Sequence, residues 1–305
     1  MGKPPYYTLS AFLRERFGGR VRKISLDAGL GCPNRDGTAG GGCIYCNARG
    51  SGTGALARGM SLKDQIESQM SAMARRYGAR SFIAYFQSYT NTYADVPTLK
   101  GIFDTILPYP EIVGLDIGTR PDCIDTEKLS LLRSYAEDRL VWVEYGLQSA
   151  NDATLERINR GHGVRAFTDA VRLTAGTGMR TCAHAIIGLP GEGMDDYLAT
   201  ARLISDLPVT DVKLHLLYVV RGTALEAMLL KGEYTPMSMD EYARAASAFI
   251  ASLRDDIVVQ RITGDPHPEE LAAPGWALRK TQVRDAVHRE LERSGLRQGS
   301  RYRAP

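Results

Sequence analysis

The chain has 305 residues, of which 44% are hydrophobic, and a formal net charge of +3. This length and apolar content predict a globular protein with one large α/β domain or two smaller ones. No run of about 18 or more apolar residues occurs, which excludes a membrane-spanning helix of ordinary length. The first ten residues also lack the layout of a secretion signal, so we expect a cytoplasmic protein with no membrane partner.

Predicted strands and helices alternate along most of the chain. Strands are expected at 21–26, 81–86, 111–118, 140–147, 180–188 and 211–220, and helices at 61–78, 97–107, 125–137, 151–159, 164–176 and 194–206. Strands separated by helices of this length predict a parallel sheet, which right-handed crossovers curl toward a barrel. Six such units predict an α/β fold of the incomplete (β/α)6 TIM-like barrel type.

The pattern changes beyond about residue 225. A helix is expected at 239–254, a short strand at 256–262, and a basic helix at 278–294. We therefore expect three parts, which are an N-terminal basic segment (1–20), the partial barrel (21–225), and an α+β C-terminal extension (226–305) packed on the barrel. In barrels of this kind the active site lies at the carboxyl ends of the strands, so motifs found there should converge.

Basic residues gather near the two ends of the chain. Residues 1–23 hold six basic side chains and one acidic one, and residues 279–303 hold eight basic and three acidic ones, so each end carries +5. The segment between them is acidic, because the whole chain carries only +3. Basic ends on an acidic body are compatible with a polyanion such as RNA, but arginines at helical spacing are also typical of a solvated helix face.

Three of the five cysteines lie close together in a glycine-rich loop after the first strand. Ten residues separate Cys32 from Cys43, and two separate Cys43 from Cys46. An odd number of clustered cysteines favours metal or redox chemistry in a reducing compartment over a disulfide framework. A closed structural zinc site needs four ligands, so three thiols leave one position open. An iron–sulfur cluster, a zinc site completed by a distant histidine, and three unliganded thiols all remain possible at this point.

Several segments resemble the radical S-adenosylmethionine (SAM) superfamily, and within it the bacterial Elongator-3-like family. They are KISLDAGLGCPNRDGTAGGGCIYC, FQSYTNTY, DIGTRPDCID, EYGLQSANDATLERINRGH and IIGLPGE, each at the end of a predicted strand. The superfamily usually has three residues, not ten, in the first cysteine gap. The resemblance implies that Cys32, Cys43 and Cys46 hold a [4Fe-4S] cluster whose fourth iron binds SAM. It also implies a reductant such as flavodoxin or ferredoxin, and a 5′-deoxyadenosyl radical that removes a substrate hydrogen.

The same resemblance implies contacts to SAM from the ends of three strands. Gln87, Ser88 and Thr90 stand where relatives carry a glycine-rich segment that contacts the SAM amino group. Gln148 and Arg160 match a pair that contacts the ribose and the carboxylate, for which an arginine fork is chemically apt. Taken alone, Arg160 could also be an arginine on a helix surface.

The fifth strand carries further expected contacts. The backbone from Ile186 to Gly188 would lie beside adenine, and His184 stands where relatives often have an aspartate that binds the ribose. The sixth strand offers His215 and Tyr218, whose roles the sequence leaves open; a lone histidine on a strand is more often a satisfied core residue. Cys182 is expected to pack in the core, and the role of Cys123 is also left open.

Two residues are candidates for catalysis. Glu144 lies within the fourth strand, where a carboxylate inside a barrel is costly unless it is paired. Arg120 follows the third strand and would either clamp an anionic substrate group or pair with Asp122.

The resemblance points to a tRNA as the substrate. Relatives in the Elongator-3 group modify the wobble uridine, and the expected step converts a carboxymethylaminomethyl group to an aminomethyl group. Arg120 or a C-terminal arginine would then bind the carboxylate. The alternatives are radical chemistry on a small metabolite or a protein glycyl residue, and a non-catalytic module that carries a metal cluster and regulates a partner. The sequence does not indicate the oligomeric state.

Overall fold

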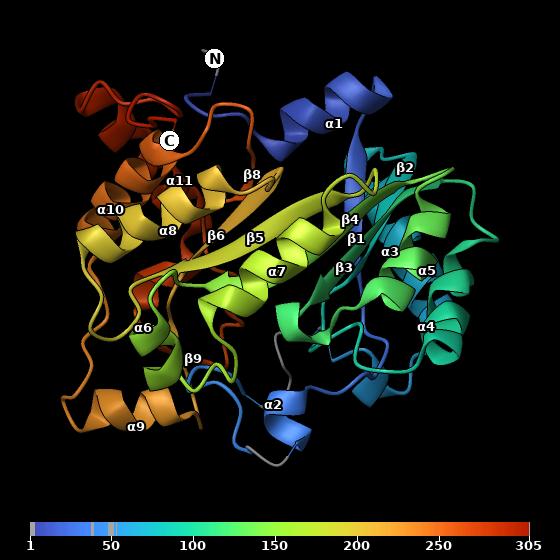
Figure 1. The fold of residues 1–305 in the computed structure, drawn as a ribbon, viewed down its shortest axis with the longest axis horizontal. Helices are drawn as coiled ribbons and strands as arrows, with labels where there is room; N and C mark the ends of the chain where they lie inside the picture. The colour runs from blue at the N-terminus through green and yellow to red at the C-terminus, as the bar shows by residue number, and fades with distance from the viewer. Residues whose placement is uncertain (1–3, 38–39, 48–51, 53, 305) are drawn as a thin grey trace.

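A computed structural model describes residues 4–37, 40–47, 52 and 54–304. Its centre is a parallel sheet of seven strands in the order β1-β2-β3-β4-β5-β6-β8 (Figure 1). The strands are β1 (Val21–Leu26), β2 (Ser81–Phe86), β3 (Ile112–Thr119), β4 (Leu140–Gln148), β5 (Arg180–Ile187), β6 (Asp211–Leu216) and β8 (Val258–Arg261). The sheet curls without closing, because β1 and β8 are not paired with each other. The predicted α/β partial barrel is confirmed.

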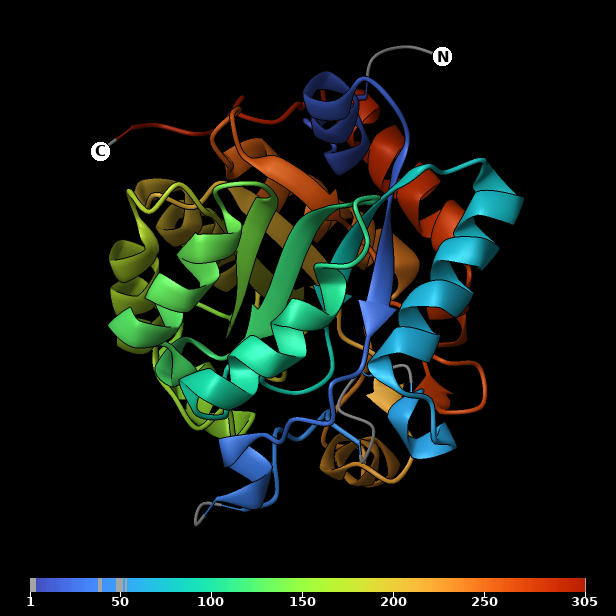
Figure 2. The same ribbon diagram turned by 90° about the vertical axis from the view of Figure 1, so that its right-hand side faces the viewer.

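Helices cover the convex face of the sheet (Figures 1 and 2). The helices of the described residues are α1 (Leu9–Phe17), α2 (Pro33–Asp36), α3 (Leu62–Tyr77), α4 (Val96–Phe103), α5 (Thr126–Tyr135), α6 (Asp152–Arg157), α7 (Val164–Thr174), α8 (Met194–Asp206), α9 (Ala224–Leu230), α10 (Met239–Ser252) and α11 (Lys280–Arg293). Several begin at a side chain that accepts a hydrogen bond from a backbone N–H three residues on, such as Ser61, Asp95 and Asp125. None of the described helices is long and apolar enough to cross a membrane.

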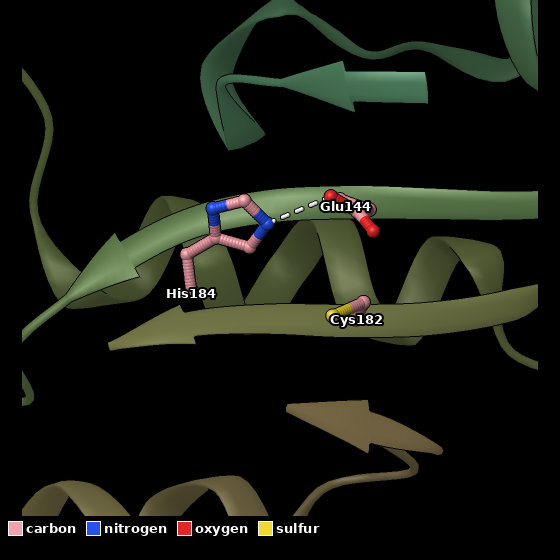
Figure 3. A group of neighbouring side chains, drawn as sticks. All are labelled: Glu144, Cys182 and His184. Atoms are coloured by element: carbon pink, nitrogen blue, oxygen red, sulfur yellow. Dashed lines mark hydrogen bonds and ion pairs between the residues drawn. The ribbon is translucent and has the colours of Figure 1, made fainter. Parts of the chain in front are cut away.

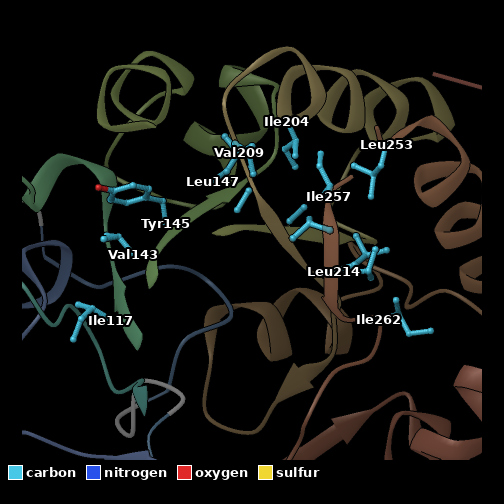
Figure 4. Close-up of a cluster of buried hydrophobic side chains, with 14 of the residues drawn as sticks. Ile117, Val143, Tyr145, Leu147, Ile204, Val209, Leu214, Leu253, Ile257 and Ile262 are labelled. Atoms are coloured by element: carbon cyan, nitrogen blue, oxygen red, sulfur yellow. The ribbon is translucent and has the colours of Figure 1, made fainter. Parts of the chain in front are cut away.

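The main hydrophobic core lies between the sheet and these helices. Alternate residues of each strand face outward, for example Ile117 on β3, Val143 and Tyr145 on β4, and Leu214 on β6 (Figure 4). These side chains are at most 1% exposed. Because the intervening residues of each strand face into the barrel, polar side chains at those positions are directed away from this core.

The C-terminal extension contributes a strand to the main sheet. The segment expected as a strand at 256–262 forms β8, which pairs in parallel with β6, so the sheet has seven strands and not six. The strand expected at 211–220 divides into β6 and a short β7 (Val219–Val220), which pairs with β9 (Leu271–Ala273) in a separate sheet. The apolar pattern predicts that a segment is extended, but it does not identify the strand with which it pairs.

The N-terminal basic segment folds into α1, which the sequence pattern did not reveal. Leu13 of α1 packs with Val21, Ile83, Trp142 and Cys182 in a cluster inside the amino end of the barrel. Cys182 is fully buried in this cluster, as expected for a core residue. The helix therefore closes the amino end of the barrel interior.

The two ends of the chain meet beside this helix. The Gln298 backbone N–H donates to the Pro5 carbonyl at 3.0 Å, and the Tyr7 N–H donates to Gln298 Oε1 at 2.8 Å. The imidazole of His288 on α11 lies 3.0 Å from the Tyr6 hydroxyl. The two basic ends of the sequence thus belong to one side of the molecule, at the amino ends of the strands (Figure 1).

Candidate active site

The concave face of the sheet changes character from one end of the strands to the other. Near the amino ends it is apolar, around Trp142 and Cys182. The middle is charged, with Lys23, Asp116, Glu144 and Lys213 on four different strands. The carboxyl ends open into a cavity of about 170 Å³, to which the cysteine loop also contributes. The predicted convergence of motifs at the carboxyl ends is observed.

Cys32, Cys43 and Cys46 all line this cavity. Cys32 caps α2, and the Cys46 N–H donates to the Cys43 carbonyl at 2.9 Å in a tight turn. Burial, and then the neighbouring thiol of Cys43, raise the pKa of Cys46 to about 11. The turn depends on Gly42, which has a φ of 71° and whose added Cβ would lie 2.9 Å from Cγ of Arg35. Three thiols are thereby brought to one wall of one cavity.

Arg160 is buried against the cysteine loop and is not a helix-surface residue. Its Nη1 donates to Cys43 Sγ at 3.6 Å, and its Nη2 donates to the Gly146 carbonyl at 2.9 Å. Asn34 Nδ2 donates to the same sulfur at 3.6 Å. A Cβ at Gly146 would lie 2.3 Å from Arg160 Nη2, so the glycine leaves room for the guanidinium in its observed position. Gln148, at a φ of 74°, lines the cavity beside Arg160.

The segment after β2 also contributes to the cavity wall. Gln87 and Thr90 line the cavity, and the Thr90 N–H donates to the Gly31 carbonyl at 3.2 Å, which joins this segment to the cysteine loop. The hydroxyls of Ser88 and Thr90 are buried without a hydrogen-bond partner among the described residues. Ser88 is not part of the cavity wall. The Thr90 hydroxyl is thus a buried polar group whose hydrogen bond the described residues do not satisfy.

The residues that were expected to contact SAM from β5 lie in three different surroundings in the structure. His184 lines the cavity, and Ile186 lines an adjoining groove of about 770 Å³. Gly188, with a φ of 97°, lies beyond the strand end, where its carbonyl accepts a hydrogen bond from the Tyr234 hydroxyl at 2.9 Å. Gly188 lies against Met237 and is in the wall of neither space.

Glu144 is held by three cationic or polar partners. One carboxylate oxygen accepts from Lys23 at 3.2 Å, and the other accepts from Lys213 and from His184 Nε2, the latter at 2.9 Å (Figure 3). Burial by itself raises the pKa of Glu144, but Lys213, Lys23 and the hydrogen bond of His184 hold it well below the usual value. Burial lowers the pKa of His184 to about 4, so the imidazole is neutral and donates to the carboxylate. The cost of burying Glu144 is thus offset by ion pairs.

The neighbouring group of Glu144, Cys182 and His184 does not suit a metal ion, although its potential ligand atoms lie within 4.8 Å of one another (Figure 3). The carboxylate oxygens already accept from Lys23 and Lys213, and a cation here would be repelled by both ammonium groups. Burial also raises the pKa of the Cys182 thiol well above its usual value. The interactions observed here are those of an internal ion network.

Arg120 is already paired. Its Nε and Nη2 donate to the two carboxylate oxygens of Asp122 at 2.9 and 2.7 Å, and its Nη1 donates to the Arg160 carbonyl at 2.8 Å. Of the two expectations for Arg120, pairing with Asp122 is the one observed. Arg120 therefore lines the cavity and holds the backbone of Arg160 through this hydrogen bond.

The cavity opens into the adjoining groove, whose far wall comes from the C-terminal extension. Seven residues line both spaces, namely Tyr45, Cys46, Gln87, Gln148, His184, His215 and Arg261. The sequence reasoning missed Arg261, although it lies at the carboxyl end of an expected strand, where the rule for barrel sites would have found it. Tyr218, whose role was left open, lines the groove. Cys123 is buried beside Asp122 and is outside both walls.

Two family models match most of the chain. The Radical SAM superfamily model matches residues 29–204, and the Radical SAM C-terminal domain model matches residues 209–293. The protein YtqA of Bacillus subtilis (strain 168) is 38% identical over 295 residues, which are 96% of this chain and 92% of that protein. The protein YhcC of Escherichia coli (strain K12) is 35% identical over 295 residues, which are 96% of this chain and 94% of that protein.

More distant similarity is found to a longer protein, the tRNA uridine(34) acetyltransferase of Dehalococcoides mccartyi (strain CBDB1). It is 29% identical over 183 residues, which are 59% of this chain and 38% of that protein. Among solved structures, the archaeal Methanocaldococcus infernus Elp3 with an N-terminal deletion has a TM-score of 0.71 at 18% identity, over 91% of this chain and 64% of that chain. Methylornithine synthase (PylB) has a TM-score of 0.52 at 13% identity, over 95% and 87%. At these identities, the two structural matches show a shared fold.

Proposed function

The chain belongs to the radical SAM superfamily, as an Elongator-3-like member, and from that premise we propose that it is an enzyme that modifies a tRNA wobble uridine by radical chemistry. The observation that carries the radical chemistry is the convergence of three thiols and a buried arginine on one cavity. The RNA substrate is supported by similarity to the tRNA uridine(34) acetyltransferases and by the distribution of basic residues.

The donor set fits a [4Fe-4S] cluster. Cys32, Cys43 and Cys46 would hold three irons and leave the fourth for the amino and carboxylate groups of SAM. The hydrogen bonds from Arg160 and Asn34 to Cys43 Sγ stabilise the negative charge of a ligating thiolate. Polar groups that SAM requires are present beyond the cysteines, and the Thr90 hydroxyl has no partner among the described residues.

We assign the SAM contacts by position in the cavity. Arg160 and Gln148 would bind the carboxylate and the ribose, and Gln87 and Thr90 would bind the amino group. His184 would lie on the ribose side. Ser88, Ile186 and Gly188 would act by shaping the backbone around these groups. When bound, the cluster and SAM supply a 5′-deoxyadenosyl radical, for which a reductant such as flavodoxin or ferredoxin provides the electron.

The barrel interior would keep this chemistry dry. The ion network of Glu144, Lys23 and Lys213 fills the space below the cavity, and α1 closes the amino end beneath it. In this proposal Glu144 and Arg120 position the cavity wall, Glu144 through His184 and Arg120 through the backbone of Arg160.

The groove provides room for a substrate larger than SAM. Along the open side of the barrel, between β1 and β8, lies a second hollow of about 610 Å³. Its charged lining residues among those described are all basic, namely Arg22, Lys23, Arg261, Lys280 and Arg284. Arg261 and Lys280 also line the groove, so basic residues follow α11 from the groove toward the basic termini. Such a track suits the phosphate backbone of an RNA whose splayed base enters the groove.

The proposed reaction converts a carboxymethylaminomethyl group on carbon 5 of the wobble uridine to an aminomethyl group. The 5′-deoxyadenosyl radical would take one hydrogen atom from the methylene beside the carboxylate, and the carbon radical would give one electron to an acceptor such as oxidised flavodoxin or ferredoxin. Water would then hydrolyse the resulting imine, which breaks the nitrogen–carbon bond and releases the two-carbon unit as glyoxylate. Nucleoside mass spectrometry of tRNA from a strain that lacks the gene tests this step. We expect carboxymethylaminomethyluridine to accumulate and aminomethyluridine with its derivatives to disappear. Unchanged wobble uridines would redirect the search to a small metabolite or a protein substrate.

The radical chemistry has its own test. Protein reconstituted anaerobically with iron and sulfide, then given dithionite and SAM, should form 5′-deoxyadenosine. Cys43→Ala should lose the bound iron, the visible absorption and the product together. Cys182→Ala is the matched control, because this thiol is buried in the apolar cluster below α1, and it should retain all three. A wild-type protein that binds the cluster and SAM but never forms 5′-deoxyadenosine would contradict the proposal.

A further inference from the structure

Four arginines line the cysteine cavity, and three of them have acceptors in the protein. Arg35 Nη1 donates to the Asn47 carbonyl at 2.7 Å. Arg120 is paired with Asp122, and Arg160 donates to the Gly146 carbonyl and to Cys43 Sγ. Arg261 has no hydrogen-bond acceptor and no carboxylate partner among the residues that the structure describes. It is therefore the guanidinium in this wall that can bind a ligand without losing a contact to the described residues.

The position of Arg261 connects the two spaces of the site. It is the last residue of β8, in register with Lys213 of β6, and it is partly buried. It lines the cysteine cavity, the groove and the basic hollow at the open side of the barrel. A group in either space can therefore contact this guanidinium.

No carboxylate contacts Arg261 among the described residues. Asp265 and Glu270 line the same groove, but Asp265 is paired with Lys280, and Glu270 accepts a hydrogen bond from Asn47. Lys23 and Lys213 are balanced by Asp116 and Glu144, with which they form ion pairs. The Arg261 guanidinium is partly exposed and has no carboxylate in contact, so it can bind an oxyanion of a ligand.

His215 provides a second, independent indication. It lines the same two spaces as Arg261, and its Nε2 is buried with no hydrogen-bond partner among the described residues. The ring lies 5.1 Å from that of His184, centroid to centroid, at the mouth of the cavity. A neutral imidazole can donate one hydrogen bond through this nitrogen, and a buried donor without an acceptor is rare in native proteins.

We propose that Arg261 and His215 bind the anionic group of the substrate, through carboxylate or phosphate oxygens, and hold the reacting carbon at the cysteine cavity. This inference rests on the proposed function, for which the anion is either the carboxylate of the wobble-uridine side chain or a phosphate of the same RNA. It assigns a substrate-positioning role to the C-terminal extension, from which Arg261 comes. The fork geometry of a guanidinium matches both kinds of oxyanion.

Two synthetic anticodon stem–loop RNAs distinguish the carboxylate from the phosphate. One carries carboxymethylaminomethyluridine at the wobble position, and the other carries the same nucleoside with its carboxylate converted to a primary amide. Binding of each RNA to the cluster-loaded protein is measured by fluorescence anisotropy for the wild type, Arg261→Gln, Arg261→Lys and Arg165→Gln. Arg165 is the matched control, because its side chain is 94% exposed on α7, away from the groove. Affinity for SAM is measured in parallel by equilibrium dialysis.

If the carboxylate is the ligand, Arg261→Gln weakens binding of the acid RNA roughly 10- to 100-fold and leaves the amide RNA unchanged, and Arg261→Lys recovers part of the loss. Equal weakening for both RNAs identifies a phosphate. The assignment is overturned if Arg261→Gln binds both RNAs as tightly as Arg165→Gln does, or if it loses SAM affinity and keeps RNA affinity. A wild type that binds the RNA but does not convert it contradicts the proposed function alone, whereas a wild type that binds neither RNA contradicts both.

Discussion

Glu144 illustrates how a single buried residue can look catalytic in sequence and have a structural explanation in three dimensions. Glu144 is 1% exposed, and its carboxylate interacts with Lys23, Lys213 and His184. A buried carboxylate on an inward-facing strand position is what sequence reasoning can detect. The identity of its partners depends on which side chains of three other strands lie next to it inside the barrel, and only the tertiary structure shows this.

The first prediction concerns this network. Glu144→Gln leaves Lys213 buried with no carboxylate in contact, so the free energy of unfolding should fall by about 3–5 kcal/mol. Glu144→Gln combined with Lys213→Met should recover a large part of this loss, because the buried charge is removed with its partner. Urea denaturation of the single and double variants measures both effects. A double variant no more stable than Glu144→Gln would contradict an ion-pair role.

The second prediction concerns Gly146. In Gly146→Ala the new methyl group would lie 2.3 Å from Arg160 Nη2 and 2.6 Å from Gln148 Nε2, so both side chains must move away from the cavity wall. We expect SAM affinity to fall roughly 10- to 100-fold as their hydrogen bonds to the ligand are lost, while the three cysteines still retain iron. Gly101→Ala on α4 is the control, because its Cβ would meet nothing within 4 Å. Equal SAM affinity in the two variants would argue against the assigned contacts of Arg160 and Gln148.

At the scale of elements, β8 and α1 have a stronger influence on the site than their sequences suggest. The short strand expected at 256–262 could have belonged to a separate sheet, but it extends the main sheet and delivers Arg261 to the cavity. The N-terminal segment, notable in sequence for its charge, uses Leu13 to close the amino end of the barrel. The local pattern predicted the extended type of β8 but not the helix α1, and in both cases the packing partner follows from the long-range fit.

The third prediction tests α1 as part of the core. Leu13 is 5% exposed and packs against Val21, Ile83, Trp142 and Cys182, so Leu13→Ala should lower the free energy of unfolding by about 2–4 kcal/mol. Leu230→Ala on α9 is the matched control, because Leu230 is 80% exposed, and it should change stability by no more than about 0.5 kcal/mol. Thermal or urea unfolding followed by circular dichroism gives both values. Similar losses in the two variants would mean that α1 does not contribute to the barrel core.

At the scale of the whole molecule, the charge distribution follows the fold and not the order of the sequence. The two basic ends are far apart in the chain but meet through Pro5, Tyr7 and Gln298. They lie at the amino ends of the strands, opposite the cysteine loop, and the basic residues along α11 connect that side to the groove. A polyanion is therefore expected to lie along the open side of the barrel, and not to be held between two separated basic arms.

The fourth prediction follows from this arrangement. Binding of an anticodon stem–loop should weaken with added salt, with a linear relation between the logarithms of the affinity and the salt concentration. Arg22→Gln combined with Arg284→Gln should reduce the slope by about 2, which is roughly one unit for each lost phosphate contact. Arg165→Gln on α7 should leave the slope unchanged. Affinity that does not depend on salt would rule out a phosphate track.

The fifth prediction concerns the response of the whole fold to pH. Burial lowers the pKa of His184 to about 4, whereas a histidine in the unfolded chain titrates near about 6.5. Between these values the unfolded chain binds a proton that the folded protein excludes, so this contribution to stability is complete above about pH 6.5 and is lost as the pH falls toward 4. His184 should account for a loss of about 2 kcal/mol between pH 8 and pH 5.

Urea unfolding of the metal-free protein at both pH values measures this loss. His184→Gln should make the dependence on pH shallower, whereas His267→Gln, at an exposed histidine, should leave it as in the wild type. An identical pH dependence in wild type and His184→Gln would show that this imidazole does not take up the proton on unfolding.

The sequence by itself determined the alternation of strands and helices, the family, and the three cysteines of the site, because hydrophobic periodicity and local spacing are properties of short segments. Only the tertiary structure decided that Arg120 is paired with Asp122, that Arg160 reaches Cys43, and that Arg261 is left without an acceptor among the described residues. The physical reason is that a side chain's charge is known from its identity, whereas its partner depends on how seven strands from distant parts of the chain are set in register.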